Sequence, residues 1–184
     1  MNQPAHILRT LDRHLRQSTR LILYGRAALA LGYAHPLPAF ASTMDVDAIL
    51  PDVEMTSIDA DEQFWLALER TNEELWTSGL YLTHLFADSQ VILRPDWLEA
   101  IQPIPLQGLE YLSLFRPSTA DLLLTKMMRV DPQDQADIRF LLAQPDLNPT
   151  ELPAICDSAR VPAIAEIQEA FSTNRAWLRR ILQA

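Results

Sequence analysis

The feature that most constrains the fold is a short apolar run at residues 20–24, which ends at Gly25 and leads directly into strong helix formers at residues 26–33. A run of this length, with Leu and Ile at its centre and a glycine stop, favours a buried strand. The Ala and Leu residues that follow favour a helix. Residues 44–50 alternate as a strand does, and Pro51 ends that pattern. The sequence therefore predicts a strand–helix–strand unit near the N-terminus.

The rest of the chain divides into a mixed part and a helical part. The other predicted helices lie at residues 5–19, 59–78, 117–129, 132–143, 150–158 and 162–182, and the other predicted strands at 80–86, 90–93 and 109–115. The first two of these strands are expected to form a hairpin, residues 34–42 a loop, and Asp59 and Ser118 helix caps. This order predicts an α/β (α+β) fold, with a small mixed sheet and flanking helices at residues 1–116 and a helical subdomain at residues 117–184 packed on it.

Composition limits the classes of function. The formal net charge is −9, which argues against tight, nonspecific binding to nucleic acid and favours partners that bring cations, such as a nucleotide with Mg²⁺ or a basic protein surface. The sequence contains no apolar run of about 18 residues, so no membrane span is predicted. The N-terminus lacks the pattern of a secretory signal. The single cysteine, Cys156, cannot form an internal disulfide and is interpreted as a small buried hydrophobe. We expect a cytoplasmic protein.

Two carboxylates, Asp45 and Asp47, lie two apart on a predicted strand, so both project from the same strand face. Their Cα atoms are expected about 7 Å apart, which lets both converge on one or two Mg²⁺ ions. The alternative is a pair of acidic residues on a solvent-facing strand surface. The apolar residues around the pair favour the metal site, because aspartate is disfavoured in strands and costly to bury without a partner.

The turn at Tyr24-Gly25-Arg26 is a candidate phosphate site. A glycine at the junction of a strand and a helix lets the backbone come close to a phosphate, which the free N–H groups of the helix can bind. The alternative is an ordinary tight turn between a strand and a helix.

Together, the glycine-ended strand, the short helix and the Thr-X-Asp-X-Asp strand resemble the start of the nucleotidyltransferase fold shared with the DNA polymerase β superfamily. More closely, they resemble the uncharacterised minimal bacterial nucleotidyltransferases related to AbiEii-type toxins of toxin–antitoxin systems. The first motif of that group is matched by Tyr24-Gly25, whereas Arg26 stands where Gly or Ser is usual. The second motif is matched by Asp45 and Asp47. The resemblance covers roughly residues 20–145.

A third motif of the AbiEii-type enzymes, Lys-X4-Asp, resembles the spacing from Lys126 to Asp131. Lys126 and Arg129 share a helix face, and Asp134 and Asp137 repeat that spacing on the next predicted helix. If the two helices pair, Asp137 would hold Lys126 or Arg129 and aim it at nucleotide phosphates. The alternative is a salt-bridged structural pair of helices.

The resemblance also implies a third carboxylate on a later strand, which would bind metal or take the proton of the acceptor hydroxyl. Asp88 is the candidate and Asp96 a poorer one. The eighteen residues between Arg26 and Asp45 exceed the usual spacing, and their prolines suggest an inserted loop. His84 alternates with apolar residues and is interpreted as a structural histidine rather than a site residue.

The sequence therefore predicts a nucleotidyltransferase dependent on Mg²⁺ (or Mn²⁺), which moves a nucleoside monophosphate from an NTP to a hydroxyl of an unknown acceptor. Asp45 and Asp47 would bind the metal, and Lys126 would counter phosphate charge in the transition state. The residues expected to contact the nucleotide are Tyr24, Gly25, Arg26, Thr43 and Arg129. The resemblance alone suggests a toxin role with a small antitoxin partner. The alternatives are a catalytically weak nucleotide-binding or protein-interaction module, and a metal-dependent phosphohydrolase.

Overall fold

The computed structural model describes residues 2–183 and, within them, all side chains except those of Thr83 and His84. The chain folds as two compact units. We call Met1–Ala87 with Ile101–Arg116 the sheet unit, and Asp88–Ala100 with Pro117–Ala184 the helical unit. The last residue of the sheet unit is Arg116. The segment Asp88–Ala100, predicted as part of the first domain, groups with the helices instead.

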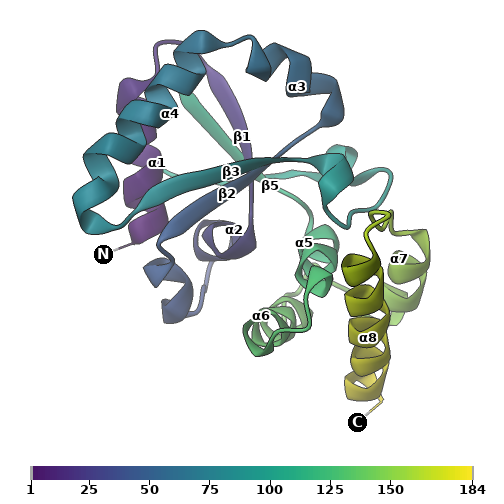
Figure 1. The fold of residues 1–184 in the computed structure, drawn as a ribbon. Coiled ribbons are helices and arrows are strands. Elements are labelled where there is room, and N and C mark those ends of the chain that lie inside the picture. Colours follow the sequence, from purple (N-terminus) through teal and green to yellow (C-terminus); the bar gives the residue numbers. More distant parts are fainter. Residues whose placement is uncertain (1, 184) are drawn as a thin grey trace. The chain divides into compact units, whose positions relative to one another are not determined.

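The sheet unit is built on a five-stranded mixed sheet with the strand order β3-β2-β1-β5-β4 (Figure 1). The strands are β1 (Thr19–Tyr24), β2 (Asp45–Leu50), β3 (Tyr81–Ala87), β4 (Gln102–Pro103) and β5 (Leu112–Arg116). The central strand β1 pairs antiparallel with β2 and parallel with β5, while β2 pairs parallel with β3 and β4 pairs antiparallel with β5. The predicted mixed α/β fold class is confirmed.

Helix α1 (Gln3–His14) begins where Asn2 caps the backbone N–H of Ala5, and it ends five residues before the predicted limit. Its apolar residues Ile7, Leu8 and Leu11 are fully buried. The Asp12 carboxylate on the same helix accepts hydrogen bonds from the backbone N–H groups of Glu110, Tyr111 and Leu112 at 2.8–2.9 Å. This carboxylate therefore fixes the approach to β5.

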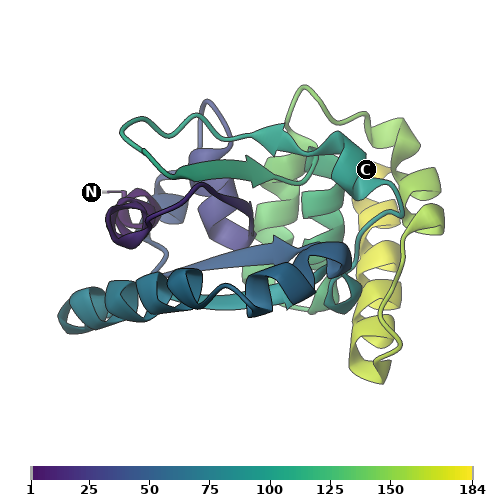
Figure 2. The ribbon, with the colours of Figure 1, turned by 90° about the horizontal axis from the view of Figure 1, so that it is seen from above.

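The single helix predicted at 59–78 is replaced by α3 (Asp52–Asp59) and α4 (Glu62–Leu75). Asp61, not Asp59, caps α4 by accepting the Phe64 N–H at 3.0 Å. Helix α3 has no buried residue, which explains why no apolar stripe marks it in the sequence. Helix α4 packs on α1 and runs alongside β3 (Figures 1 and 2).

The predicted hairpin of strands 80–86 and 90–93 is wrong in its second strand. Residues Asp88–Gln90 form a 3-10 turn, and Leu93 instead makes an isolated bridge with Arg160, whose N–H donates to the Leu93 carbonyl at 2.8 Å. The apolar run is buried as a strand would be, but its partner is a distant segment of the helical unit.

The helical unit contains α5 (Thr119–Thr125), α6 (Pro132–Leu142), α7 (Leu152–Ser158) and α8 (Ala165–Leu182). Ser118 caps α5 as predicted, since its hydroxyl accepts the Asp121 N–H at 3.1 Å. The buried Asp121 carboxylate also accepts from the backbone and the guanidinium of Arg94, and this hydrogen bonding raises the pKa of Arg94. These contacts explain why Asp88–Ala100 belongs to this unit. Within residues 2–183, no helix combines the length and the apolar character needed to cross a membrane.

Candidate functional site

The antiparallel pairing of β1 and β2 brings the two early motifs together. Tyr24, the last residue of β1, lies opposite Asp47 of β2 in the strand register. The chain then turns at Gly25 into α2 (Gly25–Leu31). The glycine turn and the second aspartate are therefore neighbours in space, although 21 positions separate them in the sequence.

Gly25 has φ +64°, a left-handed conformation that L side chains rarely adopt. A Cβ placed on Gly25 would lie 3.6 Å from Oδ2 of Asp47. The Asp47 carboxylate thus lies on the side of Gly25 where a side chain would stand. A glycine at this position adds no side-chain atom beside the carboxylate.

Asp45 and Asp47 are both half-buried, while Val46 between them and Ala48 after them are fully buried. This alternation confirms that the two aspartates share one face of β2. The Thr43 hydroxyl donates a hydrogen bond of 2.8 Å to Oδ1 of Asp45. Thr43, predicted to contact the nucleotide, therefore orients a carboxylate of the pair.

Strand β3 carries one extra residue beside Asp47. Val46 pairs with Leu82 and Ala48 pairs with Leu85, so two residues of β3 oppose the single residue Asp47 of β2. Such β-bulges bend a strand and are common next to active sites. The sequence contains no signal for this bulge, because it appears only when the register of the two strands is known.

The other two residues of the turn pack against aromatic rings. The Arg26 guanidinium lies 5.7 Å from the centroid of the Phe40 ring, a cation–π contact. Phe40 is buried and belongs to the 3-10 helix Pro38–Ser42, within the segment predicted as an inserted loop. The Tyr24 ring packs edge-on against Phe86 with centroids 5.5 Å apart. The segment predicted as an inserted loop thus packs against the guanidinium of Arg26.

The donor set of this site suits a hard cation. Two carboxylates on one strand face present oxygen ligands, which Mg²⁺ and Mn²⁺ prefer. Among the residues whose side chains are described, no three His, Cys, Asp or Glu residues are grouped so that they could hold a metal ion. A cation on this pair would complete its shell with water and phosphate oxygens.

In the helical unit, Lys126 is buried in an ion cluster. Its Nζ donates to Oδ2 of Asp137 at 2.7 Å and to Oδ1 of Asp134 at 3.2 Å. The second oxygen of Asp134 accepts from Arg129, whose side chain is 68% exposed. Two carboxylates and two cations balance one another, which favours the interpretation of a salt-bridged pair of helices. The predicted roles of Lys126 and Arg129 toward phosphate stay predictions.

The candidate third carboxylate, Asp88, is buried in the helical unit. Its Oδ2 accepts hydrogen bonds from Nε1 of the buried Trp97 at 3.0 Å and from Arg160 at 3.2 Å. These contacts give Asp88 a structural function, and its role as a metal ligand stays a prediction. Asp96 is exposed. The His84 side chain lies outside the described residues.

Comparison with known proteins supplies one finding. The sequence model of a family described as nucleotidyltransferase of unknown function (DUF6036) matches residues 5–177. Comparison with curated proteins and with solved structures gave no match. The matched range includes the glycine turn, both aspartates of β2 and the ion cluster around Lys126.

Proposed function

The chain belongs to the family of nucleotidyltransferases of unknown function, and from this premise we propose that it transfers a nucleoside monophosphate from an NTP to a hydroxyl group. Asp45 and Asp47 would hold Mg²⁺ or Mn²⁺, and the turn at Gly25 would receive the phosphates. The observation that carries the proposal is the 3.6 Å approach between Oδ2 of Asp47 and the position of a Cβ on Gly25.

This approach supports the proposal because it joins the two requirements of the reaction at one place. Carboxylate oxygens supply the ligands of a hard cation, and a glycine with φ +64° lets a bulky phosphate come close to the backbone. Since α2 spans only seven residues, phosphate binding is assigned to the bare turn and to the positive charge of Arg26, not to a helix dipole.

In the proposed reaction, the oxygen of the acceptor hydroxyl forms a bond to the α-phosphorus of the NTP. The bond from that phosphorus to the oxygen that bridges to the β-phosphate breaks, pyrophosphate leaves with the electron pair, and the hydroxyl proton passes to solvent. A bound divalent cation supplies charge neutralisation for the phosphate oxygens. The chain's own residues position the reactants: Thr43 orients Asp45, and Arg26 balances charge on the triphosphate.

The finer assignments rest on the resemblance to AbiEii-type enzymes. From it we propose a toxin role in a two-gene toxin–antitoxin system, with a small antitoxin as partner and the cytoplasm as its location. Lys126 would counter charge on the transferred phosphate, and Asp88 would be the third metal ligand. The ion pairs of Lys126 and the hydrogen bonds of Asp88 supply a competing structural explanation for both residues.

The proposal is tested by incubating the purified protein with each α-labelled and γ-labelled NTP in Mg²⁺ or Mn²⁺, with total RNA and cell protein supplied as acceptors. The double variant Asp45→Asn/Asp47→Asn is compared with Asp59→Asn, an exposed aspartate of α3 that undergoes the same chemical change. We expect pyrophosphate release and transfer of the α-label by the wild type and by Asp59→Asn, and neither by the double variant.

Three results distinguish the alternatives. Saturable NTP binding that depends on Asp45 and Asp47 but gives no label transfer would support a nucleotide-binding module. Release of free phosphate without label transfer would indicate a phosphohydrolase. If the double variant bound the NTP–Mn²⁺ complex as tightly as the wild type, the assignment of the site to β2 would be wrong.

A further inference from the structure

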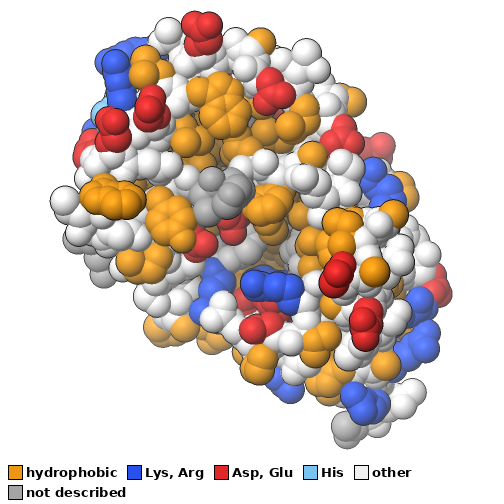
Figure 3. Space-filling model, viewed as in Figure 1, with side chains coloured by type: hydrophobic (Ala, Val, Ile, Leu, Met, Phe, Trp, Pro, Cys, Tyr) orange, Lys and Arg blue, Asp and Glu red, His pale blue; other side chains and the backbone are white. Residues whose placement is uncertain are grey.

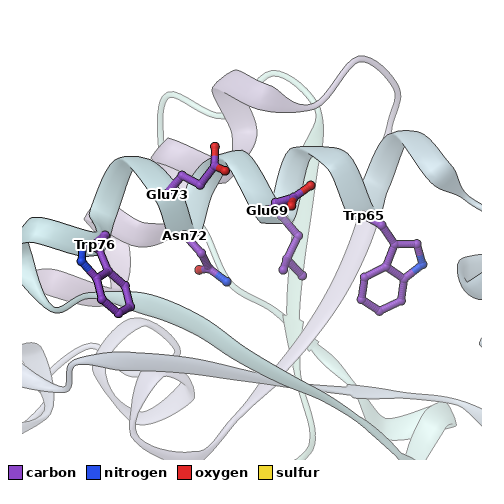
Figure 4. A pocket seen from close by; sticks show the side chains of 6 residues that line it. Trp65, Glu69, Asn72, Glu73 and Trp76 are labelled. Atoms are coloured by element: carbon purple, nitrogen blue, oxygen red, sulfur yellow. The ribbon is translucent and has the colours of Figure 1, made fainter.

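Helix α4 and the 3-10 turn that follows it (Trp76–Ser78) present a second stripe of side chains, in addition to the one that α4 buries. The buried stripe consists of Phe64, Ala67, Thr71 and Leu75. The second stripe lines an open groove of about 770 Å³, which we call the α4 groove (Figure 4). Its lining residues are Trp65, Leu68, Glu69, Asn72, Glu73 and Trp76. All of them belong to the sheet unit, and none belongs to the candidate site.

Two tryptophans flank the groove, Trp65 at one end and Trp76 at the other (Figure 4). The Trp76 side chain is 82% exposed and that of Trp65 is 38% exposed. Tryptophan is enriched among the residues that dominate binding at protein interfaces, because its large ring gains much from leaving water. Trp65 is fixed in place, since its Nε1 donates to the Ile58 carbonyl at 2.9 Å.

The charge of the groove is negative. Glu69 and Glu73 line it between the two tryptophans, and α4 as a whole carries Glu62, Glu69, Glu73 and Glu74 against the single cation Arg70. Acidic and hydrophobic side chains lie beside one another on this face of the molecule (Figure 3). A phosphate backbone would be repelled here, whereas Lys and Arg side chains would be attracted to the glutamates and to the indole rings.

The neighbouring sheet edge is already engaged at one residue beside the groove. β3 is an edge strand, and the Asn72 side chain occupies its polar groups at Leu82: Oδ1 accepts from the Leu82 N–H at 2.8 Å and Nδ2 donates to the Leu82 carbonyl at 3.1 Å. Binding by β-augmentation needs these backbone groups. At this position an occupant meets the side chains that line the groove, as a helix lying along α4 would. The eleven positions from Trp65 to Trp76 span about 16 Å, or three turns of such a helix.

We propose that the α4 groove binds a basic amphipathic helix of a partner protein. Apolar side chains of the partner cover the indoles of Trp65 and Trp76, and its Lys and Arg side chains pair with Glu69 and Glu73. This inference is independent of the proposed enzymatic function, because it uses no residue of the glycine turn or of β2.

The test uses two fluorescein-labelled helical peptides of about 18 residues, or five turns. They share one leucine face, and the opposite face is arginine in one and glutamate in the other. Fluorescence anisotropy is measured at about 150 mM salt, where distant charges are screened. We expect the arginine peptide to bind and the glutamate peptide not to bind. Trp76→Ala should weaken the binding about tenfold and Glu69→Gln/Glu73→Gln about fivefold, as for residues central to an interface.

The matched control is Glu166→Gln/Glu169→Gln, which makes the same change of net charge on exposed residues of α8. Its Kd should stay within about twofold of the wild type, since distant surface charges are screened. The proposal is overturned by absence of binding, by equal binding of both peptides, or by groove variants that behave like the control. It is also overturned if light scattering shows a dimer that Trp76→Ala dissociates, because a second copy then occupies the groove. Binding of a single-stranded oligonucleotide that depends on Trp76 would overturn it as well.

Discussion

Two clusters of charged residues, one in each unit, differ in how their charges are arranged. In the sheet unit, Asp45 and Asp47 place two like charges on one half-buried strand face beside a bare glycine turn. In the helical unit, Lys126 is buried between Asp134 and Asp137, and opposite charges are paired inside the protein. Like charges on a strand repel and gain from an added cation, whereas a balanced buried cluster stabilises the fold without one. We propose a ligand site for the first cluster and a structural role for the second.

The largest expected effect is on the activity of Asp47→Asn. Removing a preorganised charged group from such a site costs about 10²–10³-fold in rate. Stability without added metal should change by no more than about 1 kcal/mol, because Asn keeps the size of the half-buried side chain. The measurements are label transfer from NTP and urea unfolding in EDTA. A large loss of stability with unchanged NTP binding would reverse the assignment of this cluster.

The opposite pattern is expected for Lys126→Met. This change leaves the buried carboxylates Asp134 and Asp137 without their shared cation, which should destabilise the fold by about 3–5 kcal/mol. Arg129→Met is the control: it loses an ion pair of the same cluster from a largely exposed side chain, at a cost below about 1 kcal/mol. Urea unfolding of both variants measures the difference. If Lys126→Met kept its stability and lost label transfer, the catalytic role implied by the resemblance would be supported instead.

The two units also show which structural features can be predicted from the sequence and which cannot. The strand ending at Gly25 and the shared face of Asp45 and Asp47 follow from local patterns, namely a glycine stop and alternation with period two. The apolar run at 90–93 looked equally strand-like. Its pairing with Arg160 depends on a segment far along the chain, so no local pattern reveals it.

Distant partners explain two further differences, and the exposure of a helix explains a third. The bulge of β3 beside Asp47 depends on strand register. The Asp12 carboxylate serves three backbone N–H groups nearly a hundred residues away, a function that its place on a helix does not suggest. Helix α3 has no buried face and therefore no apolar periodicity. Sequence patterns located the candidate site, and tertiary contacts determined what surrounds it.

A smaller effect tests whether the glycine turn serves ligands or only the fold. Gly25→Ala places a side chain at φ +64°, which should cost about 1–2 kcal/mol of stability. Gly108→Ala imposes similar strain at φ +82° with no atom within 4 Å of the new Cβ. Both variants should lose similar stability in urea unfolding, and only Gly25→Ala should weaken NTP binding. Equal NTP affinity of the two variants would assign the turn to folding alone.

Thr43→Val removes the hydroxyl that orients Asp45 and keeps the shape of the side chain. Because a hydrogen bond to a charged group contributes about 1.5 kcal/mol, label transfer should fall about tenfold. Thr43→Ser, which keeps the hydroxyl, should restore most of the rate. The affinity for NTP–Mn²⁺ should fall in Thr43→Val and recover in Thr43→Ser. A rate that follows side-chain size instead of the hydroxyl would contradict the positioning role.

The smallest effect comes from an ion cluster at the surface, where Glu74 of α4 binds His14 and Arg13 of α1. The hydrogen bond from His14 is the main cause that lowers the pKa of Glu74 below its ordinary value of 4.5. A carboxylate whose pKa is lowered by folding stabilises the fold above its unfolded pKa and loses that contribution as the pH falls through the folded value.

Because the Glu74 side chain is 45% exposed, solvent screens the cluster and Glu74→Gln should cost no more than about 0.5 kcal/mol at pH 7. The difference between the wild type and the variant should shrink as the pH falls below 4.5 and through the lowered pKa of Glu74. Urea unfolding over an acidic pH series measures this change. If Glu74→Gln lowered the free energy of unfolding as much as Lys126→Met, burial would not be what separates a strong ion cluster from a weak one in this protein. The contrast between the two units would then lose its physical basis.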